Sequence, residues 1–193
     1  MRAWLQHSPG FSVTEGYNLD RVKNSSSEVW VTTIRDPIQR LWSSFKYEGR
    51  WTLRTQNYSR PAQSFEAWLN RTMSHTCTRK TWQCAENCFT RWFSGCSSGP
   101  VENAYAAAVA GLAQFDVVVD VAQLRSPKYV ARLEECLGRR NYKRRMPYHA
   151  EHAAAGNELY PATPITPIWM DLLNAANSVD YALLAPYTGK PPC

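Results

Sequence analysis

The chain has 193 residues, of which 44% are hydrophobic and 20% are charged. These proportions suit one folded domain with a core, and they exclude a low-complexity chain. No apolar run approaches the ~20 residues of a membrane-spanning helix, and no secretory signal is recognisable. The formal net charge of +6 favours an anionic ligand such as a nucleotide, a nucleic acid, an acidic membrane or a sulfated glycan, without choosing among them.

Residues 1–28 form an irregular segment, and the first predicted element is a strand over residues 29–34. Its nearly continuous apolar sequence is typical of a strand that is buried on both faces. A helix follows, because Asp36 can cap it, Pro37 suits its first position and Gln39 completes a capping-box pattern. Its core face is the apolar stripe at helical spacing formed by Ile38, Leu41, Trp42 and Phe45.

The rest of the chain alternates between helical and strand patterns. After a polar loop over residues 49–63, we expect helices over residues 64–71, 82–95, 101–114, 126–137 and 166–184, and a second buried strand over residues 115–121. The core face predicted for the last helix consists of Ile168, Leu172, Ala176, Val179 and Leu183. This alternation predicts an α/β fold with a parallel sheet.

The junction of the first strand and the first helix carries the most specific chemistry. Arg35 ends the strand, at the sheet edge where open α/β folds bind ligands. Arg40 and Ser43 are expected to project from the polar side of the helix. A guanidinium fork beside a hydroxyl is suited to hold a phosphate. The bare residue pattern also fits a surface arginine and a solvated serine on an ordinary amphipathic helix.

The string VWVTTIRDPIQRLWSSFKYEG resembles the 3′-phosphate-binding segment of carbohydrate sulfotransferases, which use 3′-phosphoadenosine 5′-phosphosulfate (PAPS). That segment reads roughly R-[DEN]-P-x-x-R-x-x-S-x-[FYW], and Arg35 and Ser43 have its eight-residue spacing. The resemblance implies that Arg35, Ser43 and Arg40 bind the 3′-phosphate of PAPS or of its product PAP. It also implies a P-loop-NTPase-like layered fold, in which a central parallel sheet is flanked by helices.

Looser similarities to the same family continue through residues 29–187, with residues 188–193 as a C-terminal tail. AENCFTRWFSG is similar to a segment that reads N-x-x-[TV]-R-x-[LF]-x-G, and FDVVVDVAQL is similar to a later stretch, although Gln123 stands where an acidic residue is commoner. Asn177, Asp180, Leu183 and Leu184 resemble a closing N-x-x-D-x-x-L-[LY] helix. These later motifs gain force from their order.

The family also needs a cradle for the 5′-phosphosulfate, a turn after an early strand whose N–H groups face the anion. The run at residues 23–27, KNSSS, has suitable residue types but precedes the strand instead of following one. By resemblance, we therefore expect the N-terminal strand and loop of the fold to be missing from this chain. That absence puts catalysis by this polypeptide in doubt.

Sulfuryl transfer needs a base for the acceptor hydroxyl and cations for the anionic groups. The resemblance places the base upstream of the first strand, where His7 is the candidate and Glu15 the alternative. Arg91, Arg144 and Arg145 are candidate contacts for an anionic acceptor, the last two within a basic run. We expect no metal, because His149 and His152 lack an evident third ligand.

The chain has six cysteines and three N-glycosylation sequons, at Asn24, Asn57 and Asn70. Together they favour disulfides and an oxidising compartment. The alternative is reduced thiols, with Cys84 and Cys88 packed on one helix face. The resemblance implies the Golgi lumen and a full-length form anchored through a missing N-terminal segment. A chain complete as given would be cytosolic.

Three functions remain open from the sequence. The first is a sulfotransferase that moves a sulfuryl group from PAPS to a glycan hydroxyl, with a glycan or glycoprotein as the partner. The second is a noncatalytic remnant that binds PAP or a sulfated glycan. The third, which we disfavour because the phosphate motif points to a nucleotide, is a basic nucleic-acid-binding domain.

Overall fold

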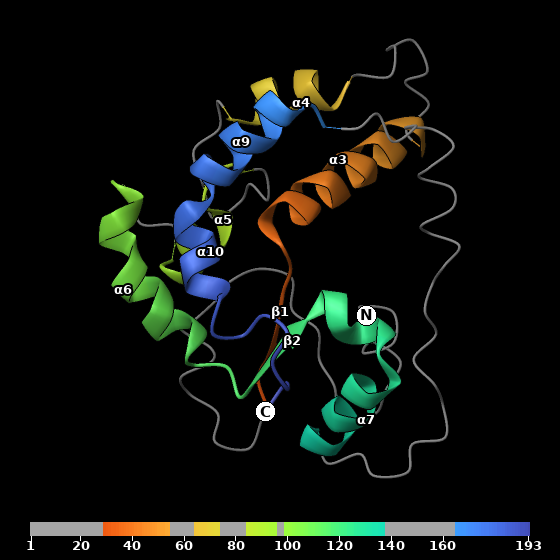
Figure 1. The fold of residues 1–193 in the computed structure, drawn as a ribbon, viewed down its shortest axis with the longest axis vertical. Coiled ribbons are helices and arrows are strands. Elements are labelled where there is room, and N and C mark those ends of the chain that lie inside the picture. The colour runs from red at the N-terminus through yellow and green to blue at the C-terminus, as the bar shows by residue number, and fades with distance from the viewer. Residues whose placement is uncertain (1–28, 55–63, 74–83, 96–98, 138–164) are drawn as a thin grey trace.

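The computed structural model describes residues 29–54, 64–73, 84–95, 99–137 and 165–193. In these ranges the protein is a mixed α/β structure, built mostly of helices with a small parallel sheet (Figure 1). Strands β1 (Val31–Ile34) and β2 (Val117–Asp120) pair in parallel, with Val31 opposite Val117 and Ile34 opposite Asp120. Both predicted strands and their parallel relationship are therefore confirmed.

Helices cover both faces of this sheet. Val118 of β2 packs in a cluster with α5 (Cys88–Phe93), α6 (Val101–Leu112) and α10 (Ser178–Leu184). Its neighbours Val117 and Val119 pack on the opposite side with Tyr129 and Leu133 of α7 (Pro127–Cys136). The alternation follows from the two-residue period of a strand. In Figure 1 the strands accordingly run between α6 on one side and α7 on the other.

Helix α3 (Pro37–Arg54) begins where the sequence predicts and ends later than expected. Asp36 Oδ1 accepts the backbone N–H of Gln39 at 2.8 Å, which is the expected N-cap. The polar loop predicted from residue 49 is wrong in its first part, because the helix continues to Arg54. Arginine and leucine are good helix formers and outweigh the single Gly49 there.

A second core cluster joins α3 to α4 (Phe65–Met73) and α9 (Pro167–Ala176), which lie close together in Figure 1. Its aromatic rings meet edge to face, with Trp42 and Phe65 centroids 4.8 Å apart and Phe45 and Phe65 centroids 5.4 Å apart. The core stripe predicted for α3 is confirmed, since its buried or half-buried members are Ile38, Leu41, Trp42 and Phe45.

Two predicted helices are wrong in extent. The helix expected over residues 82–95 is only Cys88–Phe93, because Asn87 adopts the left-handed conformation (φ 46°, ψ 46°) and ends any continuation towards the N-terminus. The helix expected over residues 166–184 breaks at Asn177 into α9 and α10. Both interruptions are made by asparagines whose side chains bond to other parts of the chain.

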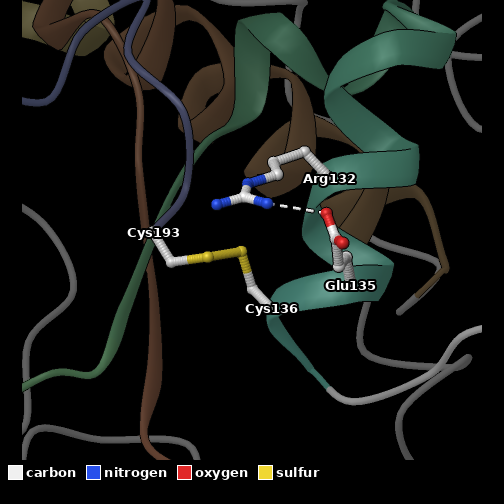
Figure 2. A network of polar contacts seen from close by, with 4 residues as sticks. All are labelled: Arg132, Glu135, Cys136 and Cys193. Atoms are coloured by element: carbon white, nitrogen blue, oxygen red, sulfur yellow. Dashed lines mark hydrogen bonds and ion pairs between the residues drawn. A yellow bond between two sulfur atoms is a disulfide. The ribbon is translucent and has the colours of Figure 1, made fainter.

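After β2 the chain passes through a 3₁₀ helix, η1 (Val121–Arg125), into α7. A disulfide joins the end of α7 to the last described residue. Figure 2 shows Cys136, at the end of α7, joined to Cys193 beside the strands, next to the ion pair of Arg132 with Glu135 at 2.6 Å. Cys84 and Cys88 also lie at disulfide distance, with Cys84 before α5 and not on it. The expectation of disulfides is thus supported. Within the described ranges, no helix is both long enough and apolar enough to cross a bilayer.

Candidate phosphate-binding turn and its supports

The turn between β1 and α3 places Arg35 at the carboxyl end of a strand, as the sequence predicts. Because Ile34 pairs with Asp120, this end of β1 adjoins the end of β2. Arg35 is half-buried. The turn is held by Asp36, whose Oδ1 accepts from the Gln39 N–H at 2.8 Å and whose Oδ2 accepts from the Tyr181 hydroxyl at 3.3 Å.

Ser43 is exposed on α3. It lies seven residues after Asp36, close to two turns of helix, so Asp36 and Ser43 share one side of α3. Six residues separate it from the first residue of the helix, which places it about 9 Å along the axis. The hydroxyl therefore faces solvent on the side of the helix where the Arg35 turn enters.

Arg40 lies elsewhere than predicted. We expected it to project with Ser43 from the polar face, and this is wrong, because its side chain is 8% exposed. Its guanidinium donates to the carbonyl of Cys84 at 2.6 Å and lies over the rings of Phe89 and Trp92, 6.0 and 5.1 Å from their centroids. A planar cation can bond to a carbonyl and rest against aromatic faces inside a protein. Arg40 thereby joins α3 to α5.

Next to Arg40 lies a group of four buried polar residues that we call the α5–α10 polar cluster: Asn87, Thr90, Asn177 and Asp180. The Asp180 carboxylate caps the start of α5. It accepts from the Phe89 N–H at 2.9 Å, from the Thr90 N–H at 2.7 Å and from the Thr90 hydroxyl at 2.7 Å. A carboxylate at a helix N-terminus satisfies N–H groups that have no partner within the helix.

The two asparagines of this cluster link the start of α5 to α10. Asn177 Oδ1 accepts from the Asn87 N–H, and Asn87 Oδ1 accepts from the Asp180 N–H, both at 3.0 Å. The Asn177 amide also donates to the carbonyls of Ala85 and Leu173 at 3.1 and 2.9 Å. Each of the four side chains therefore has hydrogen-bond partners, which is the condition for burying it without a large penalty.

Burial raises the pKa of the Asp180 carboxyl above its ordinary value. The hydrogen bonds from Thr90 and Phe89, and the positive charge of Arg40, act on that pKa in the opposite direction. Burial also raises the pKa of Tyr181 to about 12, with the nearby Asp36 carboxylate adding to the shift. The Tyr181 hydroxyl consequently stays protonated at neutral pH and can donate to Asp36.

Of the other predicted site residues, only Arg91 lies within the described residues. Arg91 is half-buried in the last turn of α5, one residue after Thr90. His7, Glu15, Arg144 and Arg145 lie outside the described residues, as do the KNSSS run and two of the sequons. Their roles as base and acceptor contacts therefore stay predictions. In the described part of the chain, no group of three His, Cys, Asp or Glu side chains could hold a metal ion.

The sequence identifies the residues of the α5–α10 polar cluster only as positions of two loose motifs, N-x-x-[TV] for Asn87 and Thr90 and N-x-x-D for Asn177 and Asp180. It predicts neither their burial nor the hydrogen bonds among them. The stripe predicted for residues 166–184 is wrong in its first turns, since Ile168 and Leu172 are 73% and 52% exposed. The face that is buried runs through Leu173, Asn177, Asp180 and Leu184, at the helical spacings of four, three and four residues. That regular spacing was the available signal.

Comparisons of this chain with protein-family models, with curated proteins and with solved structures find no match. The candidate site therefore rests on the chemistry of its residues and on the sequence resemblance described above.

Proposed function

We propose that this chain binds PAPS through Arg35 and Ser43 and moves its sulfuryl group to a hydroxyl of a glycan, as a carbohydrate sulfotransferase does. One observation carries the proposal. An arginine at the carboxyl end of a parallel strand is followed at once by a capped helix that presents a serine hydroxyl to solvent. The guanidinium would pair with the 3′-phosphate in two hydrogen bonds, and the hydroxyl would donate a third. The parallel sheet with helices on both faces is compatible with the P-loop-like layered fold of this family.

The reaction would be an in-line displacement at sulfur. The acceptor oxygen forms a new S–O bond while the bond from sulfur to the 5′-phosphate oxygen breaks, and PAP leaves with the electron pair of that bond. His7, or Glu15 in its place, would take the proton of the acceptor hydroxyl, and Arg91, Arg144 and Arg145 would hold an anionic acceptor. The 3′-phosphate contact positions the donor and takes no part in bond making. An oxidising compartment such as the Golgi lumen fits the disulfide between Cys136 and Cys193.

The test is whether the 3′-phosphate is recognised by these two side chains. Binding of PAP and of AMP, which lacks the 3′-phosphate, is measured by titration calorimetry for the wild type, Arg35→Ala and Ser43→Ala. A charged hydrogen bond contributes about 1.5–3 kcal/mol, so Arg35→Ala should weaken PAP about 10- to 100-fold. Ser43→Ala should weaken PAP about 2- to 10-fold. AMP binding should change little in either variant.

Two matched controls remove the same groups elsewhere. Arg132→Ala deletes an exposed guanidinium on α7, and Ser44→Ala deletes the neighbouring hydroxyl on α3. Both should keep the wild-type preference for PAP. Equal affinity of the wild type for PAP and AMP would overturn the proposal. Tight PAP binding without transfer of labelled sulfate to a desulfated glycan would leave the noncatalytic binding function in its place.

A further inference from the structure

We infer that Tyr181 is a positioning residue for the 3′-phosphate contact, because it holds the carboxylate of Asp36, the residue that follows Arg35, against α10. This inference rests on the proposed function. Tyr181 lies on α10, 145 residues after Asp36, and its hydroxyl reaches the Asp36 Oδ2 at 3.3 Å. Arg35, the side chain that would touch the phosphate, immediately precedes Asp36 in the turn. A residue of the C-terminal helix thus sets the conformation of the strand–helix junction.

The Tyr181 hydroxyl has two acceptors within reach, Asp36 Oδ2 and Asn174 Oδ1, each at 3.3 Å. A hydroxyl has a single hydrogen, and an ionised carboxylate is a stronger acceptor than an amide oxygen. The proton is therefore directed to Asp36. With Gln39 N–H on Oδ1, both carboxylate oxygens then have a donor within the protein.

This arrangement matters for the charge balance of the turn. An aspartate next to the phosphate-binding arginine is a rival acceptor for its guanidinium. Donors on both Asp36 oxygens reduce that competition and keep the carboxylate against α3 and α10. Without the tyrosine hydroxyl, Oδ2 loses its donor and becomes a stronger competitor for the ligand's place.

The backbone that carries Tyr181 is also held in place by its neighbours. The preceding residue, Asp180, is fully buried and accepts three hydrogen bonds from α5. The backbone of α10 is consequently fixed at the position from which the tyrosine side chain projects. Rigid support of this kind is what a positioning residue needs, because small displacements of a ligand contact weaken it strongly.

The experiment measures the ratio of PAP affinity to AMP affinity in the chain of 193 residues. Tyr181→Phe removes only the hydroxyl, and we expect the ratio to fall about three- to ten-fold, the equivalent of one hydrogen bond. Tyr105→Phe, a half-buried tyrosine on α6, is the control and should leave the ratio unchanged. A purely structural role of Tyr181 would weaken both ligands equally and would not move the ratio.

A double-mutant cycle shows whether the effect passes through Asp36. Asp36→Asn keeps an oxygen for the Gln39 N–H and removes the charge, so Tyr181→Phe should change the ratio less in that background. Suppose that Arg35→Ala removes the preference for PAP over AMP and Tyr181→Phe leaves the affinity ratio unchanged. That result would overturn the inference and leave the proposed function standing. A wild type without preference for PAP would overturn the proposed function itself, and this inference with it.

Discussion

Helices α3 and α5 each have N–H groups at their start that donate to an aspartate carboxylate. One aspartate immediately precedes its helix, and the other comes from a distant part of the chain. Asp36 lies three residues before Gln39, whose N–H it accepts. Asp180 accepts the N–H of Thr90 from 90 residues further along the chain. The first cap can form as soon as its own helix does, whereas the second requires α10 to be packed against α5. A local cap stabilises one helix, and a remote cap also stabilises the tertiary contact between two.

Their surroundings differ in the same sense. Asp36 and Arg35 are half-buried, in the turn that is proposed to bind a phosphate. Asp180 is fully buried with its partners already in place. Accessible polar residues at a strand end are suited to bind a ligand. Buried polar residues whose hydrogen bonds are made within the protein instead stabilise the fold. The comparison therefore separates a turn that is proposed to bind a ligand from a buried cluster that stabilises the packing of α5 against α10.

The most damaging change to the remote cap is Asp180→Ala. It leaves two buried N–H groups and the Thr90 hydroxyl without their acceptor, and it removes the buried charge opposite Arg40. We expect a loss of about 3–5 kcal/mol in the free energy of unfolding, measured by urea denaturation. Asp180→Asn keeps one acceptor oxygen and should lose less. A loss below about 1 kcal/mol for the alanine variant would show that the cap is replaceable by water.

Asn177→Ala tests the other half of the α5–α10 polar cluster. The change removes the acceptor of the Asn87 N–H and the donor to two carbonyls, at a site with no exposure. We expect a loss of about 2–3 kcal/mol in unfolding free energy. Asn103→Ala on the exposed side of α6 is the matched control and should stay within about 0.5 kcal/mol. Equal effects of the two variants would contradict a special role for the buried asparagine.

The same contrast explains which features the sequence could predict. β1, β2, α6 and the start of α3 are determined by neighbouring residues, through apolar spacing and a cap three residues away. The short α5 and the break at Asn177 depend on bonds between segments about 90 residues apart, which no local pattern contains.

The candidate site divides in the same way. The place of Arg35 at the strand end and the exposure of Ser43 follow from local geometry. Arg40 was misplaced because its partners, Cys84 and the rings of Phe89 and Trp92, are distant in sequence. Tyr181 was overlooked for the same reason, as its link to Asp36 spans most of the chain.

Asp36→Ala measures the local cap and should have a smaller effect on stability than either buried change. Loss of the bond to the Gln39 N–H costs about 1–2 kcal/mol at a helix N-terminus, and no buried charge is left behind. Asp36→Asn retains a capping oxygen and should stay within about 0.5 kcal/mol of the wild type. Both values come from the same urea titrations. A loss for Asp36→Ala as large as that for Asp180→Ala would remove the distinction between local and remote caps.

The smallest expected effect is on the pH dependence of stability, in which the wild type and Asp180→Asn should differ. Because burial raises the pKa of Asp180 above its ordinary value of 3.8, the native state binds this proton more tightly than the unfolded chain does. Between 3.8 and the higher native pKa, stability from this group is greatest at the acid end and is lost as pH rises. Asp180→Asn does not titrate, so the stability of the wild type relative to this variant should decline as pH rises through that window. Urea titrations of both proteins from about pH 3 to pH 7 measure this difference, and the other carboxyl groups cancel in it. A relative stability that rises with pH would mean that the hydrogen bonds from Thr90 and Phe89 outweigh burial in setting the pKa of Asp180.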